Sequence, residues 1–199
     1  EAVEKGELPE EEINAKCRKV LTYKYILGLE RKPFVKLSGL GTRINTPQTR
    51  DLISRLNLAA ITVLNNKNDV LPLHPDLKEA AILNVGKPEE IEPFDRKMKK
   101  YTSFARFQLR KDLPEAEQQK LRDSLAAYRR VIVTVTEQRL APYQSFFAKF
   151  APESPVIYVF YTPAKSMLQI QRAVSAAEAV VLAHASRDDV QERVADLLF

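Results

Sequence analysis

The side chains of this chain that could do chemistry lie mainly where apolar runs end. Glu137 follows the run 131–135, and a carboxylate at that place could act as a general acid. Gln138 is next to it, and His184 follows the run 179–183; either could bind a substrate, and His184 could serve as a base. Each has a structural alternative, since Glu137 could be a solvated loop carboxylate and His184 a structural histidine.

The other reactive residue types indicate no catalytic or metal centre. Cys17 is the only cysteine, which excludes an internal disulfide and a thiolate zinc cluster. It lies on an apolar helical stripe, so packing is favoured over a role as nucleophile. Ser186 is explained as a helix N-cap, and neither Gly-x-Ser-x-Gly nor His-Glu-x-x-His occurs. We therefore expect no bound metal.

Phosphate and nucleic-acid sites are disfavoured as well. The turn Asn84–Pro88 lacks Gly-x-Gly-x-x-Gly, and the chain has only 5 glycines, so no nucleotide cofactor is expected. The tract 96–111 could bind an anion or nucleic acid, but a helix and an edge strand protected by basic residues are favoured, and the net charge is only +5. The basic residues of this tract are Arg96, Lys97, Lys99, Lys100, Arg106, Arg110 and Lys111.

Strands and helices alternate in the second part of the chain. Three apolar runs are rich in β-branched residues, as strands covered on both faces are, whereas the run 102–107 alternates like an edge strand. The alternation predicts an α/β fold: a doubly wound, mainly parallel sheet of five to six strands with helices on both faces, of Rossmann-like or flavodoxin-like type. The expected strands are 80–85, 102–107, 131–135, 156–160 and 179–183, and the expected helices are 89–100, 114–128, 142–150, 163–174 (N-cap Thr162) and 187–198 (N-cap Ser186).

Helical linker segments precede this fold. Apolar spacing predicts a helix over 10–29, a loop or linker over 33–45, and a second helix from Thr46-Pro47 to about Leu64. The expected domains are 1–45 and 46–199, which fits a 199-residue chain with one core and an appendage. No apolar stretch is long enough for a membrane span.

Three stretches, in order, resemble glycoside hydrolase family 3. The helix Val20–Leu29 is similar to the family's "iL..K...GL" helix, which closes the catalytic barrel and leads into the linker. Residues Arg50–Leu73 are similar to "a..si.LLkN....LPL", the entry to its second domain. Val194–Phe199 resembles its closing "aA..LFG", and Ala179–His184 stands where its last strand is expected.

The resemblance implies the second, α/β sandwich domain of a two-domain retaining exo-glycosidase of the β-N-acetylglucosaminidase or β-glucosidase type. The start of the chain would then be the final helix of the barrel plus the linker, and the aspartate nucleophile would lie on the barrel. We expect the stripe of Ile13, Val20, Leu21 and Tyr25 to be exposed here, since it would belong against the barrel.

In many β-glucosidases of the family a glutamate of the second domain is the acid/base, within "VVGE" and an "E.G.D" run. Here Val133–Glu137 matches the first part only, and Leu140–Phe146 replaces the rest. The difference favours the acetylglucosaminidase-like branch, in which the barrel supplies the acid/base. Glu137 then stays a minor catalytic candidate, with Gln138 and His184 as minor substrate-binding candidates.

The expected partners are the catalytic barrel of the same polypeptide and a carbohydrate shared with it. The family suggests a bacterial protein of the periplasm or the cell exterior, while the cytoplasm stays open. The alternative function is a small-ligand-binding or regulatory module of flavodoxin-like shape. It would take a small anion near Gly86 and Glu137, where the order of the strands reverses.

Overall fold

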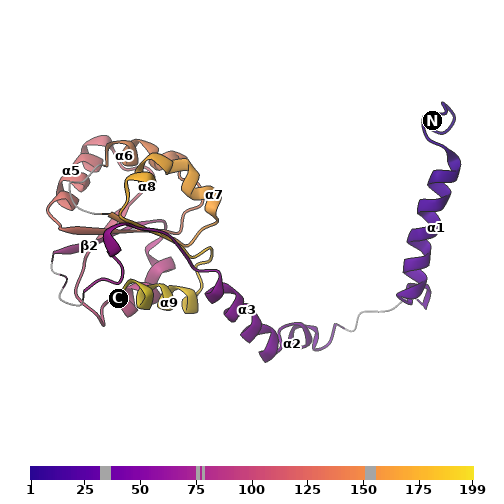
Figure 1. The fold of residues 1–199 in the computed structure, drawn as a ribbon, viewed down its shortest axis with the longest axis horizontal. Helices are drawn as coiled ribbons and strands as arrows, with labels where there is room; N and C mark the ends of the chain where they lie inside the picture. The colour runs from indigo at the N-terminus through magenta and orange to yellow at the C-terminus, as the bar shows by residue number, and fades with distance from the viewer. Residues whose placement is uncertain (32–36, 75–76, 78, 151–155) are drawn as a thin grey trace. The chain divides into compact units, whose positions relative to one another are not determined.

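In the computed structural model, residues 1–31, 37–74, 77, 79–150 and 156–199 are described. The chain divides into two compact units, Glu1–Thr46 and Pro47–Phe199. The second unit contains the sheet and its covering helices (Figure 1).

The second unit is built on a six-stranded sheet with the order β1-β6-β5-β4-β2-β3. The five strands from β2 to β6 are parallel, and β1 pairs with β6 antiparallel. This confirms the mainly parallel, doubly wound α/β fold. The strands are β1 Thr62–Asn66, β2 Ala80–Val85, β3 Ala105–Leu109, β4 Arg130–Val135, β5 Val156–Phe160 and β6 Ala179–Leu182.

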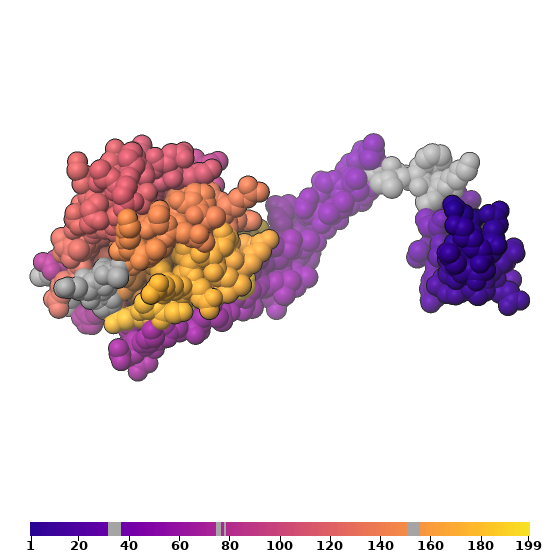
Figure 2. Space-filling view, turned by 90° about the horizontal axis from the view of Figure 1, so that it is seen from above, coloured from indigo at the N-terminus to yellow at the C-terminus, as the bar shows by residue number. Residues whose placement is uncertain are grey.

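Helices cover both faces of the sheet, as Figure 1 shows. On one face, α5, α6 and α8 pack Leu125, Phe146 and Val174 into the core. On the other face, α4 and α9 contribute Phe94 and Val194. Figure 2 shows the molecule from the side of α5, α6 and α8. The helices of this unit are α3 Pro47–Ala59, η2 Lys67–Asp69, η3 Pro88–Ile91, α4 Glu92–Met98, α5 Glu115–Ala126, η4 Ala141–Tyr143, α6 Gln144–Lys149, α7 Ala164–Met167, η5 Leu168–Ile170, α8 Gln171–Ala176 and α9 Asp188–Leu198.

The second predicted helix was too long. The observed helix, α3, ends at Ala59. Thr62–Asn66 then form the strand β1 instead of a further helical turn. The partner that stabilises β1 is β6, with Thr62 opposite Leu182, and a pairing so distant in sequence leaves no local signal. The predicted strand 102–107 lies at 105–109, and it is an edge strand as expected, paired only with β2.

The two predicted N-caps are wrong. Thr162 is buried, and α7 begins after Pro163 without a side-chain cap. Arg187 precedes α9, and Ser186 Oγ donates to the carbonyl oxygen of Glu90 at 3.0 Å. Ser186 thus joins two chain segments that lie side by side, which a local capping rule could not indicate.

The first unit contains α1 Glu10–Ile26, η1 Leu29–Arg31 and α2 Leu40–Ile44. The helix α2 lies inside the expected loop 33–45, of which residues 33–36 lie outside the described residues; it follows Gly39, whose φ of +66° suits glycine. No residue of α1 is buried. Cys17 is exposed, so the expected packing role is not seen here. No helix in the described part of the chain has the length and apolar character to span a bilayer.

Candidate functional site

The strand order reverses at the carboxyl ends of β2 and β4. From β2 the chain goes outward to β3 and then returns to β4 on the other side of β2. In open parallel sheets, ligands bind beyond the strand ends at such a point. The residues that follow these strands are therefore the first candidates for a site.

A hydrogen-bonded row of polar side chains crosses the sheet at this place. Asn84 Nδ2 donates to Gln108 Oε1 at 2.9 Å, and Thr134 Oγ1 donates to Asn84 Oδ1 at 3.1 Å. Gln108 Nε2 donates further to the carbonyl oxygen of Gly86 at 2.6 Å. The row joins β3, β2 and β4, since Asn84 is opposite both Gln108 and Thr134. Our interpretation of the sequence missed it, although a polar residue near the end of adjacent apolar runs was the available signal.

Gly86 keeps the end of β2 close to the loop after β4. Its φ is +140°, and a Cβ atom there would lie 1.9 Å from Thr136 Oγ1. The backbone N–H groups of Thr136 and Glu137 both donate to the carbonyl oxygen of Val85, at 3.0 and 3.2 Å. Gly86 therefore allows a close backbone approach within the protein.

The Glu137 side chain is half-buried and closes its own loop. Its Oε1 accepts a hydrogen bond from the backbone N–H of Arg139 at 3.0 Å. Together with burial, the Glu137 charge also raises the pKa of the nearby Tyr143 hydroxyl. The carboxylate thus has a structural partner.

Gln169 on η5 fixes the loop that contains Gln138. Its Oε1 accepts the backbone N–H groups of Leu140 and Ala141 at 2.9 and 3.2 Å. Its Nε2 donates to the carbonyl oxygen of Gln138 at 2.9 Å. The Gln138 side chain is exposed. Sequence reasoning missed Gln169, because no motif marks an amide that binds backbone groups some thirty positions away.

His184 lies just beyond β6, exposed and with φ of +63°. Among the described residues, no hydrogen bond or ion pair joins its side chain to Glu137 or Gln138. The predicted site residues therefore share one edge of the sheet without forming a catalytic pair there.

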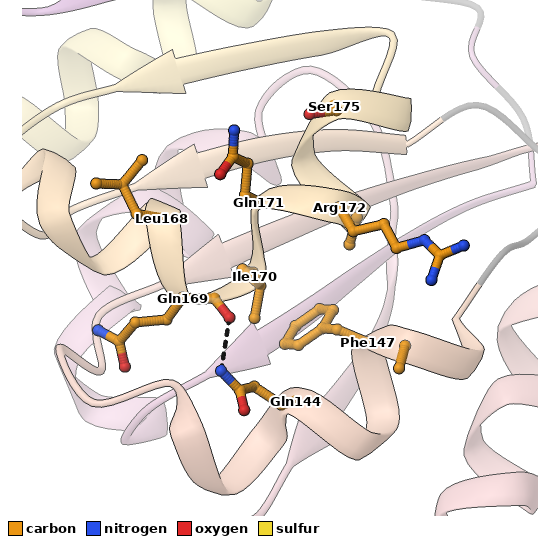
Figure 3. Close-up of a pocket in the computed structure, with 10 residues that line it drawn as sticks. Gln144, Phe147, Leu168, Gln169, Ile170, Gln171, Arg172 and Ser175 are labelled. Carbon is orange, nitrogen blue, oxygen red and sulfur yellow. Dashed lines mark hydrogen bonds between the residues drawn. The ribbon is translucent and has the colours of Figure 1, made fainter.

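A cleft of about 620 Å³ lies between α6 and the η5–α8 segment (Figure 3). Phe147 and Ile170 give it an apolar wall, and Gln144 Nε2 donates across it to the carbonyl oxygen of Gln169 at 2.9 Å. Arg172 extends from α8 at one end. In the part of the chain that the structure describes, none of the predicted site residues and no Asp or Glu lines this cleft.

Metal and anion chemistry has little support in the described residues. They contain no group of three or more His, Cys, Asp or Glu side chains that could hold a metal ion. Several bases of the tract 96–111 form ion pairs on the surface: Arg96 with Glu92 and Glu192, Lys97 with Asp196, Arg106 with Asp95 and Arg110 with Glu117. These contacts favour the structural interpretation of the tract.

Solved structures similar to this chain are sugar hydrolases. A β-glucosidase from Listeria innocua, in complex with isofagomine, superposes with a TM-score of 0.59 at 14% identity over 99% of this chain and 32% of its own. A family 3 β-N-acetylglucosaminidase from Paenibacillus gives 0.59 at 16% identity, over 99% and 39%. The chain resembles one domain of the family 3 glycoside hydrolases.

A fungal multi-domain family 3 β-N-acetylglucosaminidase is similar as well, with a TM-score of 0.57 at 15% identity over 100% of this chain and 23% of its own. This chain thus spans between about a quarter and two fifths of the glycosidases that it resembles. At these identities the likeness establishes the fold. No family model matches the sequence, and no curated protein does.

Proposed function

We propose that this chain is the accessory α/β domain of a retaining exo-glycosidase, and that it packs on a catalytic barrel of the same polypeptide. The substrate class is a terminal β-linked sugar, a β-N-acetylglucosaminide or a β-glucoside. Residues 1–45 would be the last barrel helix with the linker, and residues 46–199 the sandwich domain. The chain alone would be inactive.

The observation that carries this proposal is the extent of the structural likeness. The match extends over 99% of this chain, including its first helices, but over only 32% and 39% of two glycosidases. A free-standing module of flavodoxin-like shape would have no reason to share the helices before the sheet. The likeness is therefore what an accessory domain with its linker would give.

The exposed apolar side chains of α1 support the proposal that this helix packs on another domain. Val20, Leu21 and Tyr25 are 54%, 57% and 71% exposed, and Ile13 is 43% exposed. An apolar stripe of this kind in water marks an interaction surface. The barrel of the same polypeptide is the partner that we propose for it.

The hydrogen bonding of Glu137 supports the proposal that both catalytic residues lie on the barrel. Retaining hydrolysis needs two carboxyl groups about 5 Å apart, one as nucleophile and one as acid/base. The carboxylate of Glu137 accepts a hydrogen bond from the backbone of its own loop, which gives it a structural role. The lack of the family's acidic run after this residue favours the acetylglucosaminidase-like branch.

The experiment compares this chain with the longer polypeptide of its native reading frame. Both are assayed with p-nitrophenyl β-N-acetylglucosaminide and p-nitrophenyl β-glucoside, and the anomer released first is identified by NMR. We expect the longer polypeptide to cleave one of the two with retention, and the 199-residue chain to cleave neither. Equal turnover by the chain alone, or inversion by the longer polypeptide, would refute the proposal.

A further inference from the structure

A second cavity lies beside the polar row at the switch point. It has a volume of about 160 Å³, roughly the share of five water molecules at ~30 Å³ each. Apolar side chains, Ile82 and Ile91 among them, form one part of its wall. The polar part consists of Asn84, Gln108, Asp95 and Arg106.

The charges on this wall cancel. Arg106 Nε donates to Asp95 Oδ2 at 2.7 Å, and the pair is the only acid and base among the lining residues. An anion would meet the Asp95 carboxylate, and a cation would meet the Arg106 guanidinium. The cavity therefore favours a neutral ligand.

Hydrogen-bonding capacity remains on both partners of the pair. Asp95 Oδ1 is buried and has no hydrogen-bond partner among the described residues. Arg106 donates to Asp95 Oδ2, to the carbonyl oxygen of Phe104 and to that of Asp95, which leaves N–H groups of its five. Arg106 thus offers donors to the wall, whereas Asp95 Oδ1 lies behind the wall, out of reach of a water-sized molecule.

The buried side-chain amide of Asn84 has both a donor and an acceptor that are not fully used. Its Nδ2 donates one hydrogen bond, to Gln108, although an amide nitrogen can donate two. Its Oδ1 accepts one, from Thr134, and has a second lone pair. Asn84 is only 3% exposed, so its orientation is fixed by the fold.

We propose that this cavity binds a small neutral polyol, such as glycerol or a single sugar ring. Hydroxyl groups donate and accept at once, which matches the mixed wall, and the C–H face of such a molecule suits the isoleucines. The site belongs to the sandwich domain itself and does not depend on the proposed hydrolase function.

The test is an NMR titration of the 199-residue chain. Glycerol and D-glucose are added to ¹⁵N-labelled protein, with sodium phosphate and methylammonium chloride as charged comparators. We expect one of the polyols to give saturable shifts of the side-chain amides of Asn84 and Gln108, with no saturable shift from either salt. No saturation by about 100 mM polyol, a hundredfold above a dissociation constant of about 1 mM, would overturn the proposal, as would saturable binding of phosphate there.

Substitutions in the cavity wall test whether the polyol binds in this cavity. Asp95→Ala removes the carboxylate that holds Arg106 in the cavity wall and should weaken polyol binding about tenfold. Glu89→Ala is the matched control, since it removes an acid from the adjacent η3 at an exposed position outside the cavity wall, and it should bind as the unchanged chain does. If Asp95→Ala loses the dispersed spectrum of a folded chain, Gln108→Met on the edge strand takes its place with the same expectation. Unchanged affinity in the folded variant would overturn the assignment.

Discussion

Gln191 on α9 accepts the backbone N–H of Phe94, the third residue of α4, through its Oε1 atom at 3.2 Å. Its Nε2 donates to the carbonyl oxygen of Glu90 at 2.8 Å and to Ser186 Oγ at 3.1 Å. The side chain is 1% exposed. One buried amide thus ties the last helix to the segment that follows β2, next to the switch point.

Gln191→Leu should lower the free energy of unfolding by about 1–3 kcal/mol, because it leaves the Phe94 N–H buried without its partner and removes one of the two donors to the Glu90 carbonyl. The measurement is urea denaturation followed by circular dichroism. Gln171→Leu, at an exposed position, is the control and should change the value little. Equal values for the two variants would show that the contact contributes nothing.

Gly86→Ala should destabilise the sheet by about 1–3 kcal/mol, since φ is positive there and the new Cβ would collide with Thr136 Oγ1. Gly41→Ala is the matched control, because nothing lies within 4 Å of its Cβ position. Thermal unfolding of both variants measures the difference. Adding Thr136→Ala to the Gly86 variant should recover part of the loss; no recovery would show that the backbone conformation alone matters.

Stability should fall at acid pH through Asp196. A hydrogen bond from Lys97, then one from Tyr101, lowers the pKa of this carboxyl in the folded chain. A lowered folded pKa means that the stabilisation is present above the unfolded pKa of about 3.9 and is lost as pH falls through the folded value. Asp196→Asn should therefore melt at a lower temperature at pH 7, and its melting temperature should approach that of the unchanged chain as pH falls below the ordinary pKa of an aspartate. Asp112→Asn, an exposed control, should show no such convergence. A constant difference across pH for Asp196→Asn would contradict the assignment.

Glu137→Gln in the longer polypeptide should lower kcat by less than about fivefold, because the residue closes a loop and the barrel is proposed to supply the acid/base. Steady-state hydrolysis of the p-nitrophenyl substrates measures this. A loss of about 10² or more, the size of a missing general acid, would make Glu137 catalytic after all.

Replacing Leu21 and Tyr25 together by serine tests whether α1 is exposed in the 199-residue chain and buried against the barrel in the longer polypeptide. In the 199-residue chain the double variant should leave the melting temperature unchanged, because both side chains are exposed. In the longer polypeptide it should lower the melting temperature, since the stripe would then be buried. An exposed pair on the same helix, Lys16 and Lys19 changed to serine, is the control. No effect in the longer polypeptide would remove α1 from the domain contact.

Most of the sheet could be predicted because its strands are buried on both faces. Runs such as Val131–Val135 are apolar except for one residue, Thr134, and the helices between the runs indicate a parallel order. β1 could not be predicted in this way, because three of its five residues are exposed and its partner β6 is more than a hundred residues away. The predicted helix therefore extended to about Leu64.

The site was harder to predict than the fold. Glu137, Gln138 and His184 were named as candidates because strand ends are the general place for ligands in such sheets, and their roles stay predictions. Gln169 and Asp95 were not, since each acts on a segment brought near only by the fold. Asn84 and Thr134 gave a usable signal, because each is a lone polar residue at the same register of neighbouring strands.

The most direct measurement is to sequence the native reading frame upstream of Glu1. We predict a parallel β/α barrel whose last helix is α1, with an aspartate nucleophile on one of its loops and a second carboxyl or a His-Asp pair as acid/base. A start codon immediately before Glu1, with no barrel, would contradict the accessory-domain account.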